Sequence, residues 1–133
     1  MSDIASNTVT AKTVALVGHC GPDSSFLRMA VSSALPGAQV KMVDDDNELE
    51  ATVNQGVDLL LFNRVLEFGF TNRQGQELLE QVREKHPDLA VMMVSNFDDA
   101  QQAAEDAGAK PGFGKNEIGT DKVKDRIRAA VGL

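Results

Sequence analysis

The stretch Val57-Asp58-Leu59-Leu60-Leu61-Phe62 is almost entirely apolar, and Asn63 follows it directly. A run this short and without alternation is typical of a parallel strand that is covered on both faces of its sheet. Runs of similar length and character lie on either side of it: Val14 to Val17, Val40 to Val43, and Leu89 to Val94. Together these runs predict the strands of one parallel sheet.

Segments with helical periodicity separate the runs, and capping residues, glycine or proline mark their ends. The expected helices are Ser24 to Leu35, Asp45 or Asp46 to Gly56, Arg73 to Lys85, Asp98 to Gly108, and Thr120 to Val131. Glu48 is placed to complete a capping box on Asp45 at the start of the second helix. The expected apolar face of the first helix consists of Phe26, Leu27, Ala30, Val31 and Ala34.

A fifth strand between Gly108 and Ile118 is expected on topology alone, because Pro111-Gly112-Phe113-Gly114 is poor strand material. Strand-then-helix units in this number predict an α/β fold, a doubly wound, five-stranded parallel sheet with helices on both faces. We take its strand order to be 2-1-3-4-5, as in flavodoxin-like folds. Residues 1–11 are expected to be a flexible N-terminal leader, and residues 12–133 a single domain.

Composition excludes several classes of function. The chain has 133 residues, of which 42% are hydrophobic and 25% charged, as in an ordinary globular domain. Its 13 basic and 20 acidic residues give a net charge of −7, which argues against binding to nucleic acid or to an acidic membrane. No apolar run approaches the roughly 20 residues that span a bilayer. The single cysteine, Cys20, excludes an internal disulfide and fits a reducing cytoplasm.

Polar and reactive side chains follow each expected strand. They are His19, Cys20, Asp44, Asp45, Asn63, Ser95, Asn96 and Lys115. In a doubly wound sheet, ligands bind at the carboxyl ends of the strands, next to the point where the strand order reverses. With the order 2-1-3-4-5, this point lies between the first and third strands, so His19, Cys20 and Asn63 are expected to come together there.

Short segments along the chain resemble the receiver domain of two-component response regulators, which is CheY-like in fold. They are Asp58 to Asn63, Gly75 to Leu79, Val91 to Ser95, and Gly108-Ala109 followed by Lys115. The resemblance covers about residues 12 to 132, nearly the whole chain. It implies a receiver fold and a role in signal transduction, with Ser95 and Lys115 retained from the functional residues of the family.

The departures from this family concern its chemistry. Receivers take a phosphoryl group on an aspartate at the position of Asn63, and a carboxamide has no anionic oxygen to act as nucleophile. An acidic pair that holds Mg²⁺ in the family is replaced by His19 and Cys20, which are softer ligands. Gly112 stands at the aromatic switch position, and the loop from Arg64 to Asn72 is about four residues longer than usual. The resemblance therefore implies an atypical receiver, or pseudo-receiver.

We therefore expect a cytoplasmic signalling or scaffolding module that acts by protein–protein interaction without aspartate phosphorylation. We expect no enzymatic activity, no cofactor and no metal. By the resemblance, a protein partner docks on the last two helices and the fifth strand. The chain is expected to be a monomer or weak homodimer that binds neither nucleic acid nor membrane.

Other functions remain open at this stage. Cys20 precedes a helix N-terminus and adjoins His19, so a thiol-based redox sensor or a phosphocarrier-like protein is one alternative. Asp23 in the same loop would repel a phosphate. A small-ligand-binding, flavodoxin-like domain is another alternative. A metal shared by His19 and Cys20 is disfavoured, because successive side chains of a strand point to opposite faces.

Two retained residues have two interpretations each. Lys115 is either a cation for an anionic ligand or for the carbonyl of Asn63, or a solvated lysine without a role. Ser95 either contacts Asn63 or caps the end of its strand.

Overall fold

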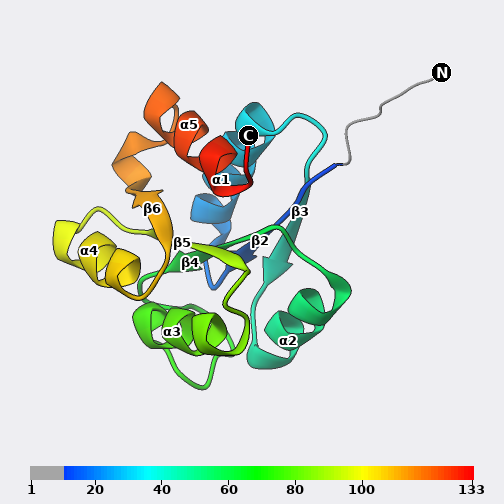
Figure 1. Cartoon of the computed structure of the whole chain (residues 1–133), viewed down its shortest axis with the longest axis vertical. Coiled ribbons are helices and arrows are strands. Elements are labelled where there is room, and N and C mark those ends of the chain that lie inside the picture. Colours follow the sequence, from blue (N-terminus) through cyan, green and yellow to red (C-terminus); the bar gives the residue numbers. More distant parts are fainter. Residues whose placement is uncertain (1–10) are drawn as a thin grey trace.

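Residues 11–133 are described by the computed structural model shown in Figure 1. The leader predicted for residues 1–11 thus lies outside the described residues, apart from Ala11. The strands are β2 (Thr13–Val17), β3 (Gln39–Val43), β4 (Leu59–Asn63), β5 (Ala90–Val94) and β6 (Lys110–Phe113). They form one parallel sheet in the order β3-β2-β4-β5-β6, which confirms the predicted order.

Helices cover both faces of this sheet (Figure 1). They are α1 (Gly21–Ala34), α2 (Asp46–Gln55), α3 (Gly75–Lys85), α4 (Asp98–Asp106) and α5 (Asp121–Ala130), with a short 3-10 helix, η1 (Lys115–Glu117). α1 and α5 pack on one face, and α2, α3 and α4 pack on the other. Among the described residues, no helix has the length and apolar character that crossing a membrane requires.

Strand β4 is the centre of the molecule, and all of its residues are buried. Because successive side chains alternate, Leu60 and Phe62 enter the core beneath α2, α3 and α4, whereas Leu59 and Leu61 enter the core beneath α1 and α5. This alternation explains why the stretch is apolar throughout: both of its faces are covered by helices.

Helix α1 differs from the prediction at its start and on its outer face. It begins at Gly21 rather than Ser24, since extended Cys20 serves as its N-cap and Pro22 lies in the first turn, where the missing N–H is not needed. Leu27 and Val31 are buried, but Phe26 is 56% exposed, so its predicted inward placement is wrong. A step of about 100° around the helix separates Phe26 from the buried stripe.

Helix α2 begins as predicted, but its capping box is displaced by one residue. The Asp45 carboxylate accepts a hydrogen bond from the Glu48 amide at 2.7 Å. The Glu48 carboxylate accepts one from the Asp44 amide at 2.7 Å, and not from Asp45 as a capping box requires. Both bonds nevertheless fasten the end of β3 to the start of α2.

Glycines in β6 and directly after it allow close packing against β5 and the residues that follow β5. A Cβ on Gly112 would lie 2.1 Å from the Met93 carbonyl oxygen, and one on Gly114 would lie 2.1 Å from Asn96 Oδ1. The pairing of β5 with β6 is irregular between Met92 and Val94. The amide of Gln101 on α4 compensates by donating to the carbonyls of Met93 and Phe113.

Candidate functional site

The ends of β2 and β4 meet at the carboxyl edge of the sheet, as the strand order requires. Asn63 is buried there, and its Nδ2 donates to the Gly18 carbonyl oxygen at 3.0 Å. The Asn63 side chain is therefore tied to the backbone at the end of the neighbouring strand. It has no charge with which to attack phosphorus or hold a cation.

His19 points into the protein rather than toward a ligand. Its side chain is fully buried, and its Nε2 lies 2.9 Å from the Leu61 carbonyl oxygen. Burial lowers the pKa of His19 to about 4, although the hydrogen bond to the Leu61 carbonyl acts in the opposite direction. Neutral His19 therefore donates from Nε2, while its Nδ1 is buried without a hydrogen-bond partner.

Lys115 has a partner that the sequence did not suggest. Its ammonium lies 2.6 Å from the carboxylate of Asp23, in the first turn of α1. The hydrogen bond from Lys115 holds the pKa of Asp23 below its usual range, against the smaller effect of desolvation. Lys115 is thus neither a free cation facing Asn63 nor a fully solvated lysine. Asp23, which was expected to repel a phosphate, neutralises the charge of Lys115.

Ser95 lies at the end of β5 and is buried. Its hydroxyl accepts a hydrogen bond from the Phe97 amide at 3.1 Å. This is the local turn geometry expected of a serine that closes a strand end. Of the two interpretations of Ser95, the structure therefore supports the capping role.

Cys20 is partly exposed at the N-cap of α1. Its thiol also contributes a hydrogen bond that lowers the pKa of Asp23, after the larger contribution of Lys115. The sulfur therefore has a carboxylate beside it, which disfavours the approach of a phosphoryl group. Within residues 11–133, His, Cys, Asp and Glu side chains form no group of three or more that could hold a metal ion.

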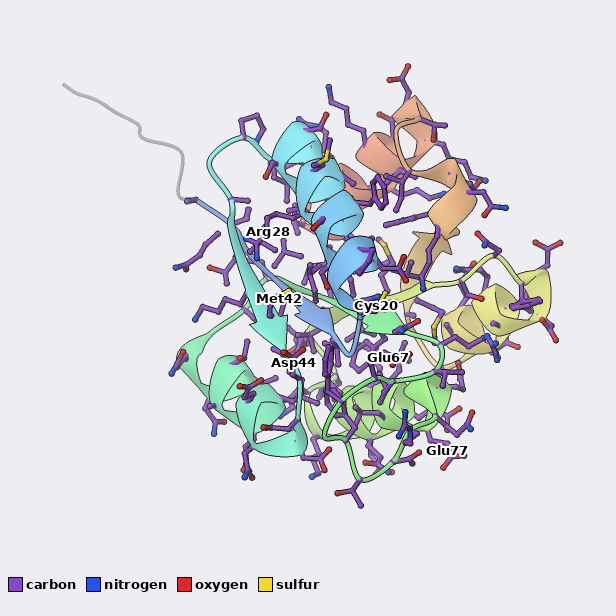
Figure 2. The ribbon with its side chains drawn as sticks, turned by 180° about the vertical axis from the view of Figure 1, so that it is seen from behind. Cys20, Arg28, Met42, Asp44, Glu67 and Glu77 are labelled. Carbon is purple, nitrogen blue, oxygen red and sulfur yellow. The ribbon has the colours of Figure 1, made fainter. Side chains whose placement is uncertain are left out.

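The long loop between β4 and α3 covers the carboxyl edge. This segment, residues 64–74, is called the edge strap below. Its Glu67 amide donates to the Gly18 carbonyl at 2.9 Å, and its Gly69 amide donates to the Asp44 carbonyl at 2.9 Å. Figure 2 shows Glu67 near the strand ends that carry Cys20 and Asp44. The strap therefore closes over the ends of β2 and β3.

Two buried side chains anchor the edge strap in the core. Leu66 is fully buried and Phe70 nearly so, both in the core beneath α2, α3 and α4. Gly18 has a φ of +72°, and a Cβ there would lie 2.7 Å from Leu66 Cδ2. Only glycine fits this backbone position beneath the strap. The extra length of the loop was visible in the sequence, but its path over the strand ends was not.

Two cavities lie away from Asn63. One, of about 500 Å³, lies between α4, β6 and α5 and reaches Ser95 and Asn116. The other, of about 600 Å³, lies between α2 and α3. Neither of them is lined by Asn63, His19 or Cys20.

Comparisons with known proteins support the fold. No family model and no curated protein matches the sequence. Among solved structures, NtrX from Brucella abortus is 20% identical with a TM-score of 0.76, covering 92% of this chain and 28% of its own. The N-terminal signal receiver domain of a Bacteroides fragilis response regulator is 15% identical with a TM-score of 0.74, covering 93% of this chain and 99% of its own.

A third solved structure is the signal receiver domain of the DNA-binding response regulator merR from Colwellia psychrerythraea. It is 12% identical with a TM-score of 0.70, covering 92% of this chain and 99% of its own. This chain thus spans about a quarter of NtrX but nearly all of the isolated receiver domains. At such low identities the likeness shows a receiver-type fold, and the predicted fold class is confirmed.

Proposed function

We propose that this chain is a receiver-fold signalling or scaffolding module that binds other proteins and does not work by phosphorylation at position 63. It is not an enzyme under this proposal. The observation that carries it is Asn63, a neutral side chain tied to the Gly18 carbonyl where a phosphoacceptor needs an anionic oxygen. A carboxamide cannot form an acyl phosphate.

The surroundings of Asn63 support the same function. Mg²⁺ needs oxygen ligands, and the positions that would supply them hold His19, which is buried, and Cys20. The ammonium of Lys115, which would otherwise be available to a phosphoryl group, is paired with Asp23. The edge strap adds backbone contacts over the strand ends. The nucleophile, the ligands for the cation and the free ammonium group that phosphorylation would need are thus all missing from this site.

The proposed docking surface consists of α4, β6 and α5. The cavity of about 500 Å³ on this surface has a polar lining. Acidic Asp98 and Glu105 line it from α4, and basic Lys122 and Arg126 line it from α5. A surface with both charges fits a protein partner with complementary polar groups, and it does not form the positive footprint that nucleic acid requires. A cytoplasmic location and a monomeric or weakly dimeric state remain predictions.

Repair of the phosphoacceptor tests this proposal. Asn63→Asp is treated with acetyl phosphate, with and without Mg²⁺, and its intact mass is measured after circular dichroism has shown that it folds. We expect no Mg²⁺-dependent phosphoryl adduct, because the ligands for the cation are still missing. An adduct that requires Mg²⁺ would contradict the premise that the cation site is lost and would mean that other carboxylates, such as Asp44 or Asp45, hold the ion.

Thiol chemistry at Cys20 is the competing function. Its supporting observation is that this partly exposed sulfur lies at the N-cap of α1, where no side chain caps the helix. The carboxylate of Asp23 beside it weakens this alternative. Because the two functions depend on different residues, the reactivity of Cys20 separates them.

A further inference from the structure

A groove of about 600 Å³ lies between α2 and α3. Both helices lie on the face of the sheet opposite α1 and α5 (Figure 1). Each helix lines the groove with one face, because the lining residues recur at helical spacing. Along each helix these residues extend over about 12 Å, or roughly two turns. The groove is therefore elongated, and its length suits a segment of secondary structure.

The floor of the groove is apolar. It consists of Leu49 and Val53 from α2, and Leu78 and Val82 from α3. Val53 is the most exposed of them, and the other three are 6–7% exposed because they also belong to the core. On each helix the two side chains are four residues apart, so they form a stripe along the groove. An apolar stripe of this kind accepts the apolar face of an amphipathic helix, whose side chains recur at the same spacing.

The walls of the groove carry opposite charges at its two ends. Both α2 and α3 begin at the carboxyl edge of the parallel sheet, so they run in the same direction. Asp46 and Glu50 lie in the first half of α2, and Lys85 lies at the end of α3. Within the part of the chain that the structure describes, neither Glu50 nor Lys85 forms an ion pair. The groove therefore changes from negative to positive along its length.

We propose that this groove binds an amphipathic helix of a partner protein, antiparallel to α2 and α3. A helix is stabilised by acidic residues in its first turn and basic residues in its last turn. Such a helix matches the groove in only one direction: its acidic N-terminal end lies near Lys85, and its basic C-terminal end lies near Glu50. Charge complementarity thus fixes both the kind of partner and its orientation.

This inference goes beyond the proposed function. It shares with that function only the premise that the chain binds proteins, and it uses neither Asn63 nor the α4–β6–α5 surface. Phosphorylation experiments do not probe the groove, and peptide binding to the groove does not depend on the chemistry at position 63. Either proposal can therefore fail while the other stands.

Two synthetic peptides of about 14 residues test the proposal. Both have leucine at positions i, i+4, i+7 and i+11; one has glutamate in the first turn and lysine in the last, and the other has these charges exchanged. Fluorescence anisotropy at low ionic strength measures their binding to the full chain. We expect the peptide with N-terminal glutamate to bind about tenfold more tightly, because exchange turns attractions into repulsions at both ends.

Variants assign this preference to the groove. The double variant Glu50→Lys with Lys85→Glu reverses the charges of the walls, and we expect it to prefer the other peptide. Both side chains are exposed, so the fold should tolerate the exchange. Glu84→Lys makes the same kind of charge change on α3 outside the groove and should leave the preference intact.

Three results would overturn the proposal. Equal affinity for the two peptides would show that the charged ends do not select a partner, and no saturable binding of either would show that the groove takes no helix. Self-association of the chain that Glu50→Lys abolishes, measured by sedimentation, would assign the groove to a second copy of this protein.

Discussion

Protonation of His19 should make the fold sensitive to acid. The pKa of His19 is about 4 in the folded protein and 6.5 in an unfolded chain. The unfolded chain therefore binds an extra proton between these values, and the free energy of unfolding falls as the pH falls from 6.5 to about 4. At 1.36 kcal/mol for each pKa unit, this loss amounts to about 3 kcal/mol. The loss becomes negligible about one pH unit above 6.5.

The variant His19→Gln isolates this effect. Glutamine does not titrate, and its amide can still donate to the Leu61 carbonyl. Urea unfolding at several pH values between about 7 and 4 gives the free energy of unfolding of both proteins. We expect the wild type to lose about 3 kcal/mol more than His19→Gln over this interval. His86→Gln is the matched control, because it makes the same substitution at the exposed histidine of the chain. Parallel curves for wild type and His19→Gln would refute the reasoning.

Other perturbations address the carboxyl edge. A double-mutant cycle with Asp23→Asn and Lys115→Met should give a coupling free energy of about 0.5–1 kcal/mol in unfolding experiments, since the ion pair is partly exposed. A coupling of zero would show that this ion pair does not stabilise the fold. Gly18→Ala should lower the free energy of unfolding by about 2 kcal/mol or more, because the backbone is left-handed and Leu66 fills the space of a Cβ; a neutral effect would mean that the edge strap does not press on this site. Cys20 should be alkylated at pH 7 no faster than cysteine in an unstructured peptide, and a much faster reaction would favour thiol chemistry.

The fold could be predicted because it follows from the local pattern of apolar and polar residues along the chain. The apolar stretch that became β4 has no polar side, since helices cover both faces of a doubly wound sheet, and this is visible without any tertiary contact. The boundaries of α1 and α3 were less predictable. α3 starts at Gly75 rather than Arg73, because Gln74 pairs with Val65 and the Arg73 carbonyl accepts from the Leu66 amide within the edge strap.

The candidate site could be predicted in its residue types but not in its contacts. Asn63 could be identified from the residues that precede it, because it ends an apolar strand. The pairing of Lys115 with Asp23 joins residues 92 positions apart, and no local pattern links them. The burial of His19 likewise depends on the neighbouring strand, whose Leu61 carbonyl accepts its hydrogen bond. Such contacts follow from the assembled sheet rather than from the sequence around each residue.

The most direct test of the central claim is the intact mass of the wild-type protein after incubation with acetyl phosphate and Mg²⁺. The account predicts an unchanged mass, because Asn63 has no nucleophilic oxygen and neither His19 nor Cys20 supplies a carboxylate for the cation. A phosphoryl adduct that depends on Mg²⁺ and is labile to hydroxylamine, as an acyl phosphate is, would contradict the account.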